Sequence, residues 1–570
     1  MRVRGINLTV IGIFLLLSFG IFKLQVINRE KFTQLSDKNC IRLISQEGAR
    51  GKIIDRKGDL IVGSKLTYDL MLLPQDKIQI DNTLKRLSEL IPINFKDLKN
   101  TFRRNYIAPF IPVVILKNID MQKAIMLGEL KADYNNIIIQ PKPVRYYPCD
   151  KLASHVLGYL NEIDTWRLMK LQEYGYKVKD IVGYGGIEEK FDYYLRQTEG
   201  ALSVEVDYRS RFTRVLGFKS SEDGEDIQLS IDINIQKIAE NSLAGIKGSV
   251  ILMDPYSGEI IAMASSPDFS PSAFTEGPSS YMSQLKDSSL LNRSISGLYP
   301  SASVFKLVSA CAGLESGKIN PSTTYFCPGS MGIGNRNFKC WSTHKEENLA
   351  DAIAHSCDVY FYKLGLMLGP QTIHDYALKF GLSKLTGVDL PYEASGVIPD
   401  PLWKRMHNFQ SWYDGDTANF VIGQGYVLVT PIQIVRLMAV FANGGMLVRP
   451  YIVKSVGGKD ISKYQKSISR ISIKEDVINQ VRQDLRRVVS ASDGTAHTLS
   501  NLVVTVAGKT GTAEFSRGLT HGWFAGFFPY KKPKFVICVF IEDNGSGHMA
   551  TALSKRIIEE MVKQNLIETL

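Results

Sequence analysis

The chain lacks the short motifs that identify several large classes of protein. It contains no Walker phosphate-binding loop, no dinucleotide-binding glycine fingerprint, no recognisable nucleic-acid-binding module and no internal repeat. These absences argue against an NTPase, a Rossmann-type oxidoreductase, a nucleic-acid-binding protein and a solenoid. The net charge of +11 is spread over both halves of the chain, as on an ordinary solvated surface. The same charge would also suit anionic lipid head groups or cell-wall polymers.

Long hydrophobic runs are also scarce. One run, from Ile6 to Phe22, is long enough to span a bilayer, and it is interrupted by only three polar residues. Arg2 and Arg4 precede this run, so the positive-inside rule places the N-terminus in the cytoplasm and the rest of the chain outside. No small-x-small cleavage site and no lipobox cysteine follow it, which favours an uncleaved anchor over a cleaved signal peptide.

Three short motifs carry most of the functional information. In chain order they are Ser303-Val304-Phe305-Lys306, Ser356-Cys357-Asp358 and Lys509-Thr510-Gly511-Thr512. Each motif alone is weak, because a Ser-x-x-Lys arises by chance in a chain of this length. Together they resemble the S-x-x-K, S-D-N and K-T-G set of the penicillin-binding proteins and serine β-lactamases. The set indicates a serine acyltransferase that acts on a peptide ending in a carboxylate.

The first motif has the residue types that serine acylation requires. A serine hydroxyl is a weak nucleophile until a base takes its proton. The apolar run from Ala302 to Leu314 predicts a buried helix opened by Ser303, with Lys306 one turn later on the same face. Free N–H groups at the start of a helix favour developing negative charge and can form part of an oxyanion hole. Lys306 can act as a base only when neutral, and burial beside a second cation, Lys509, would lower its pKa.

The third motif is expected on a strand that binds the substrate. The β-branched run from Leu502 to Val506 predicts a strand that continues into Lys509. Gly508 and Gly511 would let another backbone approach, so that an extended peptide adds along this edge. The terminal carboxylate of that peptide would meet the lysine charge and the threonine hydroxyls. The predicted substrate-binding residues are Thr510, Gly511 and Thr512.

The middle motif ends in Asp358, where the general pattern has Asn. In this respect the chain resembles the elongation-type class B enzymes, the penicillin-binding protein 2 family, rather than the division enzymes. The segment Gly423-Gln424-Gly425-Tyr426 fits the same family. The segment from Arg50 to Gly58 is similar to the R-G-x-I-x-D-R-x-G signature of the class B pedestal. The resemblance covers essentially the whole chain and is weakest in the predicted head.

The resemblance implies a multidomain fold, and 570 residues are enough for more than one domain. We expect a cytoplasmic tip and transmembrane anchor over 1–27. A mixed α+β pedestal, or dimerisation-type domain, would follow over 28–222, with a head insertion at about 66–140 that meets partners. Residues 223–570 would form an α/β serine transpeptidase domain with an antiparallel sheet flanked by helices. The boundary lies near Ser220 to Asp226, where a polar run gives way to an apolar strand.

The resemblance also implies a reaction. Ser303 would attack the penultimate D-alanine carbonyl of a stem pentapeptide, with Lys306 as the general base. Backbone N–H groups of Ser303 and Thr512 would hold the oxyanion. Ser356, with Lys306 or Lys509, would pass a proton to the leaving D-alanine. Asp358 would orient the substrate and the lysine, and an acid at this position could also hold a positive charge on either lysine. An amine from a neighbouring stem peptide would then form the cross-link.

The biological setting follows from the same resemblance. We expect a peptidoglycan D,D-transpeptidase of cell-wall elongation and rod-shape maintenance, acylated by penicillin and other β-lactams. It would lie in the cell inner membrane as a single-pass protein, with its bulk in the periplasm. The implied partners are peptidoglycan stem peptides, a SEDS-type (RodA-like) glycan polymerase and MreC-like elongation proteins, with no nucleic acid.

Two other functions use the same sequence features. A D,D-carboxypeptidase or a β-lactamase would pass the acyl group to water. The anchor and the pedestal argue against both, since hydrolases that act alone seldom need a membrane-tethered stalk. The other alternative is mainly a non-catalytic activator of a membrane glycan polymerase, and the three intact motifs argue against this as the sole role.

Seven cysteines in an exported chain cannot all pair internally. Four residues near the middle motif are suited to tetrahedral zinc: Cys327, Cys340, His344 and Cys357. Some relatives in the penicillin-binding protein 2 family carry metal-ligand residue types at the matching positions. Such a zinc would be structural, because three cysteines and a histidine close the coordination sphere, and the chemistry needs no metal. A Cys327–Cys340 disulfide is the alternative that an oxidising periplasm allows.

Overall fold

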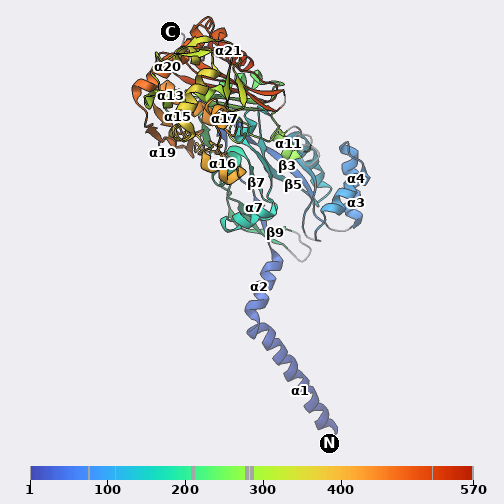
Figure 1. Ribbon diagram of the computed structural model, residues 1–570. Helices are drawn as coiled ribbons and strands as arrows, with labels where there is room; N and C mark the ends of the chain where they lie inside the picture. Colours follow the sequence, from blue (N-terminus) through green and yellow to red (C-terminus); the bar gives the residue numbers. More distant parts are fainter. Residues whose placement is uncertain are drawn as a thin grey trace. The chain divides into compact units, whose positions relative to one another are not determined.

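A computed structural model describes residues 2–74, 77–108, 111–206, 212–276, 282, 288–516 and 518–567 (Figure 1). The chain forms two compact units, each assembled from separate stretches of sequence. The first unit comprises Met1–Gly51, Ser64–Arg145 and Arg196–Glu225. The second comprises Lys52–Gly63, Tyr146–Leu195 and Asp226–Leu570.

The N-terminal helix α1 spans Arg2–Phe22, dark blue in Figure 1. The stretch Thr9–Ile27 has a mean hydropathy of 2.3, and none of it is buried against the rest of the protein. It is the one helix in the described part of the chain that is long and apolar enough to cross a membrane. Helix α2 (Arg29–Cys40) follows it.

The first unit contains two groups of paired strands and a core of its own. One sheet has the order β1-β8-β9, and in the other β3 pairs with both β4 and β5. Side chains such as Leu70, Leu84, Leu127 and Ile137 form a separate hydrophobic core within this unit. The strands are β1 (Ile41–Gln46), β3 (Leu60–Leu72), β4 (Val113–Ile119), β5 (Ile137–Tyr146), β8 (Gly200–Val206) and β9 (Phe212–Lys219); the helices are α3 (Lys77–Leu90), α4 (Phe95–Asn105) and α5 (Met121–Glu129).

The segment from Arg50 to Gly58 contributes a turn to the second unit. The carboxylate of Asp55 accepts hydrogen bonds from the backbone N–H groups of Lys57 (2.7 Å) and Asp59 (2.9 Å). Lys57 also pairs with Asp232 at 2.8 Å. The acidic and basic residues of this motif therefore have a structural role. Nearby elements are β2 (Ile53–Ile54), α6 (Ser154–Leu157), β6 (Tyr159–Glu162), α7 (Thr165–Leu171), β7 (Ile181–Tyr184), α8 (Gly186–Lys190), α9 (Asp192–Leu195), β10 (Ile227–Leu229) and β18 (Val453–Val456).

A five-stranded antiparallel sheet forms the centre of the second unit, as the sequence predicts. Its order is β12-β11-β23-β22-β21, so strands from the two ends of this unit's sequence lie side by side. Helices α10 and α21 pack together against the sheet, and α18 and α20 form a second pair of helices that contact it. The strands are β11 (Gly248–Met253), β12 (Ile260–Ser266), β21 (Ala507–Ser516), β22 (Leu519–Phe528) and β23 (Phe535–Ile541).

Beyond Asp226, the described helices of the second unit are α10 (Ile233–Ser242), α11 (Ser272–Glu276), α13 (Lys306–Glu315), α14 (Leu349–Ala354), α15 (Asp358–Lys379), α16 (Pro401–Asn408), α17 (Asp414–Val421), α18 (Pro431–Asn443), α19 (Ser462–Gln465), α20 (Glu475–Ser490) and α21 (Gly547–Lys563). The shorter strands are β13 (Tyr325–Cys327), β14 (Ser330–Ile333), β15 (Arg336–Lys339), β16 (Lys345–Glu347), β17 (Met446–Val448), β19 (Lys459–Asp460) and β20 (Ile468–Arg470).

Two local predictions were wrong. The predicted strand from Leu502 to Val506 is absent, and β21 starts only at Ala507, opposite Phe527 of β22. Pro529 lies just beyond that pairing, and a proline has no N–H to extend a ladder. The predicted helix opened by Ser303 begins instead at Lys306. Ser303 lies in a short 3₁₀ turn ahead of it.

Glu240 is a mostly buried acid on α10, and it makes stability depend on pH. Its Oε1 accepts hydrogen bonds from the backbone N–H of Ala153 (2.7 Å) and from the Gln236 amide (2.8 Å). Burial raises the pKa of Glu240 to about 7. Because this pKa is higher in the folded than in the unfolded protein, the protonated acid contributes its full stability at pH values below the unfolded-state pKa of 4.5. This contribution is lost as the pH rises to about 7.

Replacing Glu240 by glutamine should therefore stabilise the protein more at alkaline than at acidic pH. Glutamine keeps the accepting oxygen but cannot ionise. Between about pH 5 and pH 8, the gain in unfolding free energy of Glu240→Gln over the wild type should grow by on the order of 2 kcal/mol. Urea unfolding curves at both pH values measure it. The prediction would be contradicted if the difference in unfolding free energy between Glu240→Gln and the wild type were the same at both pH values.

Candidate active site

Ser303 is held at the surface of an otherwise buried segment. It is the one residue between Ser301 and Gly313 that is not buried. The segment is fixed from both sides: the Ala302 N–H donates to the Gly423 carbonyl (3.0 Å), and the Trp523 indole donates to the Pro300 carbonyl (2.9 Å). The serine hydroxyl is therefore reachable, while its backbone is fixed.

Lys306 is fully buried and surrounded by oxygen atoms of the middle motif. Its Nζ donates to the Ser356 carbonyl (2.8 Å), the Ser356 Oγ (3.2 Å) and Oδ1 of Asp358 (2.8 Å). The ring of Phe361 lies 5.4 Å away. Within the described residues, these contacts account for all three donors of the ammonium group, and none of them is with Ser303.

The middle motif lies at the junction of α14 and α15. Ser356 has a positive φ of 56°, which turns the chain between the two helices. Asp358 is the first residue of α15, where free backbone N–H groups favour a carboxylate. This turn places the Ser356 hydroxyl and the Asp358 carboxylate on the same ammonium group.

Lys509 is the second fully buried lysine of the site. Its Nζ donates to the carbonyl of Thr510 (3.2 Å). Burial and the charge of Lys306 both lower the pKa of Lys509 well below its ordinary value of 10.5, and Asp358 opposes them. The site therefore encloses two basic groups beside a single carboxylate, a combination typical of catalytic sites.

The glycines of the third motif serve the protein's own packing. A Cβ on Gly511 would lie 3.0 Å from the Ala302 Cβ and 3.4 Å from the Ser303 nitrogen. A Cβ on Gly508 would lie 2.7 Å from the Ala525 carbonyl oxygen in β22. These glycines therefore let the catalytic segment and β22 approach β21; the addition of a substrate backbone along β21 stays a prediction.

The two threonines of the third motif already have partners. The Thr510 hydroxyl donates to Oγ1 of Thr495 (2.9 Å), and Oγ1 of Thr512 accepts from the Gly547 N–H at the start of α21 (2.9 Å). Thr495 also donates its N–H and its hydroxyl to the Ala354 carbonyl, both at 3.2 Å. Thr495 thus joins the second and third motifs. The sequence analysis missed it, and its one signal is the turn-rich run from Ser492 to Thr495.

The four predicted metal ligands meet beside this site. The ligand atoms of Cys327, Cys340, His344 and Cys357 all lie within 4.8 Å of one another. Nδ1 of His344 lies 3.7 Å from the Cys327 sulfur and 3.5 Å from the Cys340 sulfur. Ligands of tetrahedral zinc are separated by roughly 3.8 Å, so the three thiols and one imidazole fit such an ion. No disulfide joins Cys327 to Cys340 in this structure, where all seven cysteines are free thiols.

The cluster touches the catalytic residues directly. Cys357 immediately precedes Asp358, and the Asp358 N–H points at the Cys340 sulfur (3.2 Å). The pKa of the Cys340 thiol is lowered, first by a hydrogen bond with Cys357 and then by one with His344, while burial acts in the opposite direction. A thiolate is the form that binds metals.

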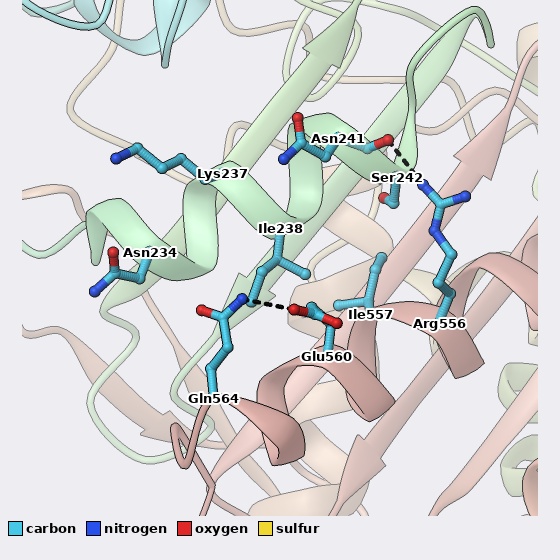
Figure 2. A pocket seen from close by; sticks show the side chains of 9 residues that line it. All are labelled: Asn234, Lys237, Ile238, Asn241, Ser242, Arg556, Ile557, Glu560 and Gln564. Carbon is cyan, nitrogen blue, oxygen red and sulfur yellow. Dashed lines mark hydrogen bonds between the residues drawn. The ribbon is translucent and has the colours of Figure 1, made fainter.

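A separate groove of about 400 Å³ lies between α10 and α21. Figure 2 shows two hydrogen bonds among its lining residues: Arg556 donates to the Asn241 carbonyl (2.8 Å) and Gln564 to Glu560 (2.8 Å). None of the three motifs contributes a residue to it. The chemistry therefore belongs to the Ser303 site.

Comparison with known proteins agrees with this description of the site. Residues 248–561 match the penicillin-binding protein transpeptidase domain, and residues 45–229 match the penicillin-binding protein dimerisation domain. The peptidoglycan D,D-transpeptidase MrdA of Acinetobacter baumannii is 31% identical over 94% of this chain and 84% of its own length.

Solved structures agree with the sequence relatives. The PBP2 of Helicobacter pylori, in complex with MreC, aligns with a TM-score of 0.82 at 27% identity, over 92% of this chain and 99% of that chain. A chain of a peptidoglycan synthase complex aligns with a TM-score of 0.74 at 29% identity, over 100% of this chain and 99% of that chain. The chain therefore belongs to the class B penicillin-binding proteins, as a peptidoglycan D,D-transpeptidase of the penicillin-binding protein 2 group.

Proposed function

We propose that this transpeptidase cross-links stem peptides through an acyl-enzyme on Ser303 during cell-wall elongation. The observation that supports it most directly is the position of Ser303. It is accessible in an otherwise buried segment, next to Gly511 of β21 and one turn before the buried Lys306. No other arrangement in the described part of the chain brings an accessible serine together with two buried lysines.

Acylation begins with proton transfer from Ser303. Lys306 acts as the general base and takes this proton, and Asp358, 2.8 Å from Nζ, holds the lysine in position. The Ser303 oxygen attacks the penultimate D-alanine carbonyl, and backbone N–H groups of Ser303 and Thr512 stabilise the oxyanion. The C–N bond then breaks, and the proton passes from Lys306 through the Ser356 hydroxyl, 3.2 Å away, to the leaving D-alanine amine.

The second half of the reaction reverses these roles. An amine of a neighbouring stem peptide attacks the acyl carbon, gives its proton to Lys306 and displaces the Ser303 oxygen, which is reprotonated. Lys509 in its charged form attracts the terminal carboxylate of the donor peptide, together with Thr510 and Thr512. β-Lactams enter the same first step and leave a Ser303 ester.

The remaining parts of the chain have supporting roles in this proposal. We assign the anchor to residues 1–27, the pedestal to 28–222 with a head at about 66–140, and the transpeptidase domain to 223–570. Arg2 and Arg4 hold the N-terminus in the cytoplasm, and the bulk lies in the periplasm of a single-pass inner-membrane protein. An MreC-like protein and a RodA-like glycan polymerase are the proposed partners, since similar proteins occur in complexes with MreC and in a peptidoglycan synthase complex.

The thiol and imidazole cluster is proposed to hold one structural zinc ion. Cys327, Cys340, His344 and Cys357 would supply its four ligands, and the ion would fix the loop of Cys340 against the start of α15. The ion supplies rigidity rather than chemistry, since all four positions are taken by protein ligands.

A covalent adduct on Ser303 is the first prediction of this function. Full-length protein incubated with benzylpenicillin should gain the mass of one drug molecule, and Ser303→Ala should gain none. Ser316→Ala replaces an exposed serine just after α13; this variant is the matched control and should be acylated like the wild type. Intact-mass spectrometry measures all three. No adduct on the wild type, or rapid turnover of the drug, would contradict an acyl-enzyme transpeptidase.

The second prediction concerns Asp358 and pH. Lys509 must be charged to attract the substrate carboxylate, so acylation should fall as the pH rises through the lowered pKa of Lys509. The charge of Asp358 raises that pKa, so Asp358→Asn should move the alkaline fall to lower pH. The pH profile of the acylation rate constant with a D-alanyl-D-lactate ester measures it. A shift to higher pH, or none, would be evidence against this role of Asp358.

The third prediction concerns the metal. Protein purified without chelator should contain one zinc per chain by elemental analysis, and Cys340→Ala should have lost most of it. The variant should also acylate more slowly by about tenfold, because the start of α15 loses its support. Cys149→Ser, outside the cluster, should keep both zinc and rate. The proposal would be ruled out if wild-type protein freed of zinc were as active and as heat-stable as zinc-containing wild-type protein.

A further inference from the structure

A small cavity lies beside α17. Its volume is about 180 Å³, enough for one side chain but not for a whole peptide. It is formed by the start and end of α17 and by the segment that follows this helix. The lining residues are Pro399, Trp412, Asp416, Asn419, Phe420, Gln424, Gly425 and Tyr426.

A carboxylate with one free oxygen lines this cavity. Oδ2 of Asp416 accepts from the Lys404 ammonium (2.6 Å) and from the Tyr413 N–H (2.8 Å). Within the described residues, Oδ1 has no hydrogen-bonding partner. Lys404 is only 3% exposed and lies near the rings of Tyr413 (5.2 Å) and Tyr426 (5.8 Å), so Asp416 is held in place. The cavity thus offers a fixed acceptor for a proton donor.

The other walls suit an alkyl chain with a polar end. The rings of Trp412, Phe420 and Tyr426 supply apolar surface, and aromatic faces also attract a cation. The side-chain amides of Asn419 and Gln424 are partly exposed and have no partner among the described residues. A flexible methylene chain that ends in an ammonium group matches this combination of walls and acceptor.

The cavity is within reach of the nucleophile. A Cβ on Gly423 would lie 2.4 Å from the Ala302 carbonyl oxygen, and Ala302 directly precedes Ser303. Gly425, which lines the cavity, is two residues beyond Gly423, and two residues of extended chain span at most about 7 Å. A residue next to the reacting carbonyl can therefore place its side chain in the cavity.

The reaction itself supplies a ligand of this kind. Cross-linking needs an amine on the acceptor stem peptide, and donor and acceptor have the same composition before they react. The donor therefore carries the same amine, on a side chain close to its D-alanine residues. We propose that the Asp416 cavity binds this amino-terminated side chain of the donor peptide and so selects donors that still carry a free amine.

This proposal rests on the proposed function, and it adds a specificity site to it. Held at Asp416, the donor's amine is kept away from its own acyl carbon. The cavity would favour uncross-linked stem peptides as donors. Because Lys404 already balances the charge of Asp416, the free oxygen contributes mainly one charge-assisted hydrogen bond.

The test compares two donors on the full-length protein in detergent. One is Nα-acetyl-L-lysyl-D-alanyl-D-lactate, with a free side-chain amine, and the other is the same compound with that amine acetylated. The wild type should be acylated by the first with a higher second-order rate constant, by roughly fivefold. Asp416→Asn should lose most of this preference by slowing on the free amine only.

Controls separate this proposal from the proposed function. Asp414→Asn removes an exposed acid from the same helix outside the cavity and should keep the preference. Benzylpenicillin carries no such amine, so its acylation rate should be equal in Asp416→Asn and in the wild type, which also shows that the variant is folded. No preference in a wild type that benzylpenicillin acylates would overturn the cavity's role and leave the acyl-enzyme intact. A preference kept by Asp416→Asn would overturn it as well.

Discussion

The burial of two lysines beside one carboxylate is the constraint on which the rest of the site depends. Lys306 and Lys509 are both fully buried, and removing an ammonium group from water is costly unless it is paired or loses its proton. Asp358 pairs with Lys306, and Lys509 responds with a lowered pKa. Asp358, in place of the Asn of the general pattern, thus puts one carboxylate beside the two buried lysines. It makes Lys306 the partner of an acid rather than of a neutral amide.

Keeping that pair in place is the task of the surrounding structure. Thr495 ties Thr510 of β21 to the Ala354 carbonyl, just ahead of the turn at Ser356. On the other side, the Cys340 sulfur lies against the Asp358 N–H. Two loops far apart in sequence therefore support the start of α15. A metal at the cysteine and histidine cluster would act on catalysis through this position, without any contact with the substrate.

Motif order was enough to predict the family, the antiparallel sheet flanked by helices and the residues that gather around Lys306. The cysteine and histidine cluster was also predictable, because three thiols and an imidazole are the residue types that suit a tetrahedral zinc ion. Local geometry was less so. The β-branched run at Leu502 did not form a strand because its partner strand, β22, ends at Phe528, just before Pro529. Thr495 and the Asp416 cavity depend on loops that only the folded chain brings together, and no residue pattern marks them.

The protonation of Lys509 tests the central claim most directly. In protein labelled with ¹³C-lysine, the Cε resonance of Lys509, assigned through the Lys509→Arg variant, can be followed against pH without any substrate. The account predicts a titration midpoint well below that of the surface lysines, because Lys509 is buried and lies near Lys306. A midpoint with the surface lysines, near 10.5, would contradict it. Burial and the charge of Lys306 would then have no net effect on the pKa of Lys509.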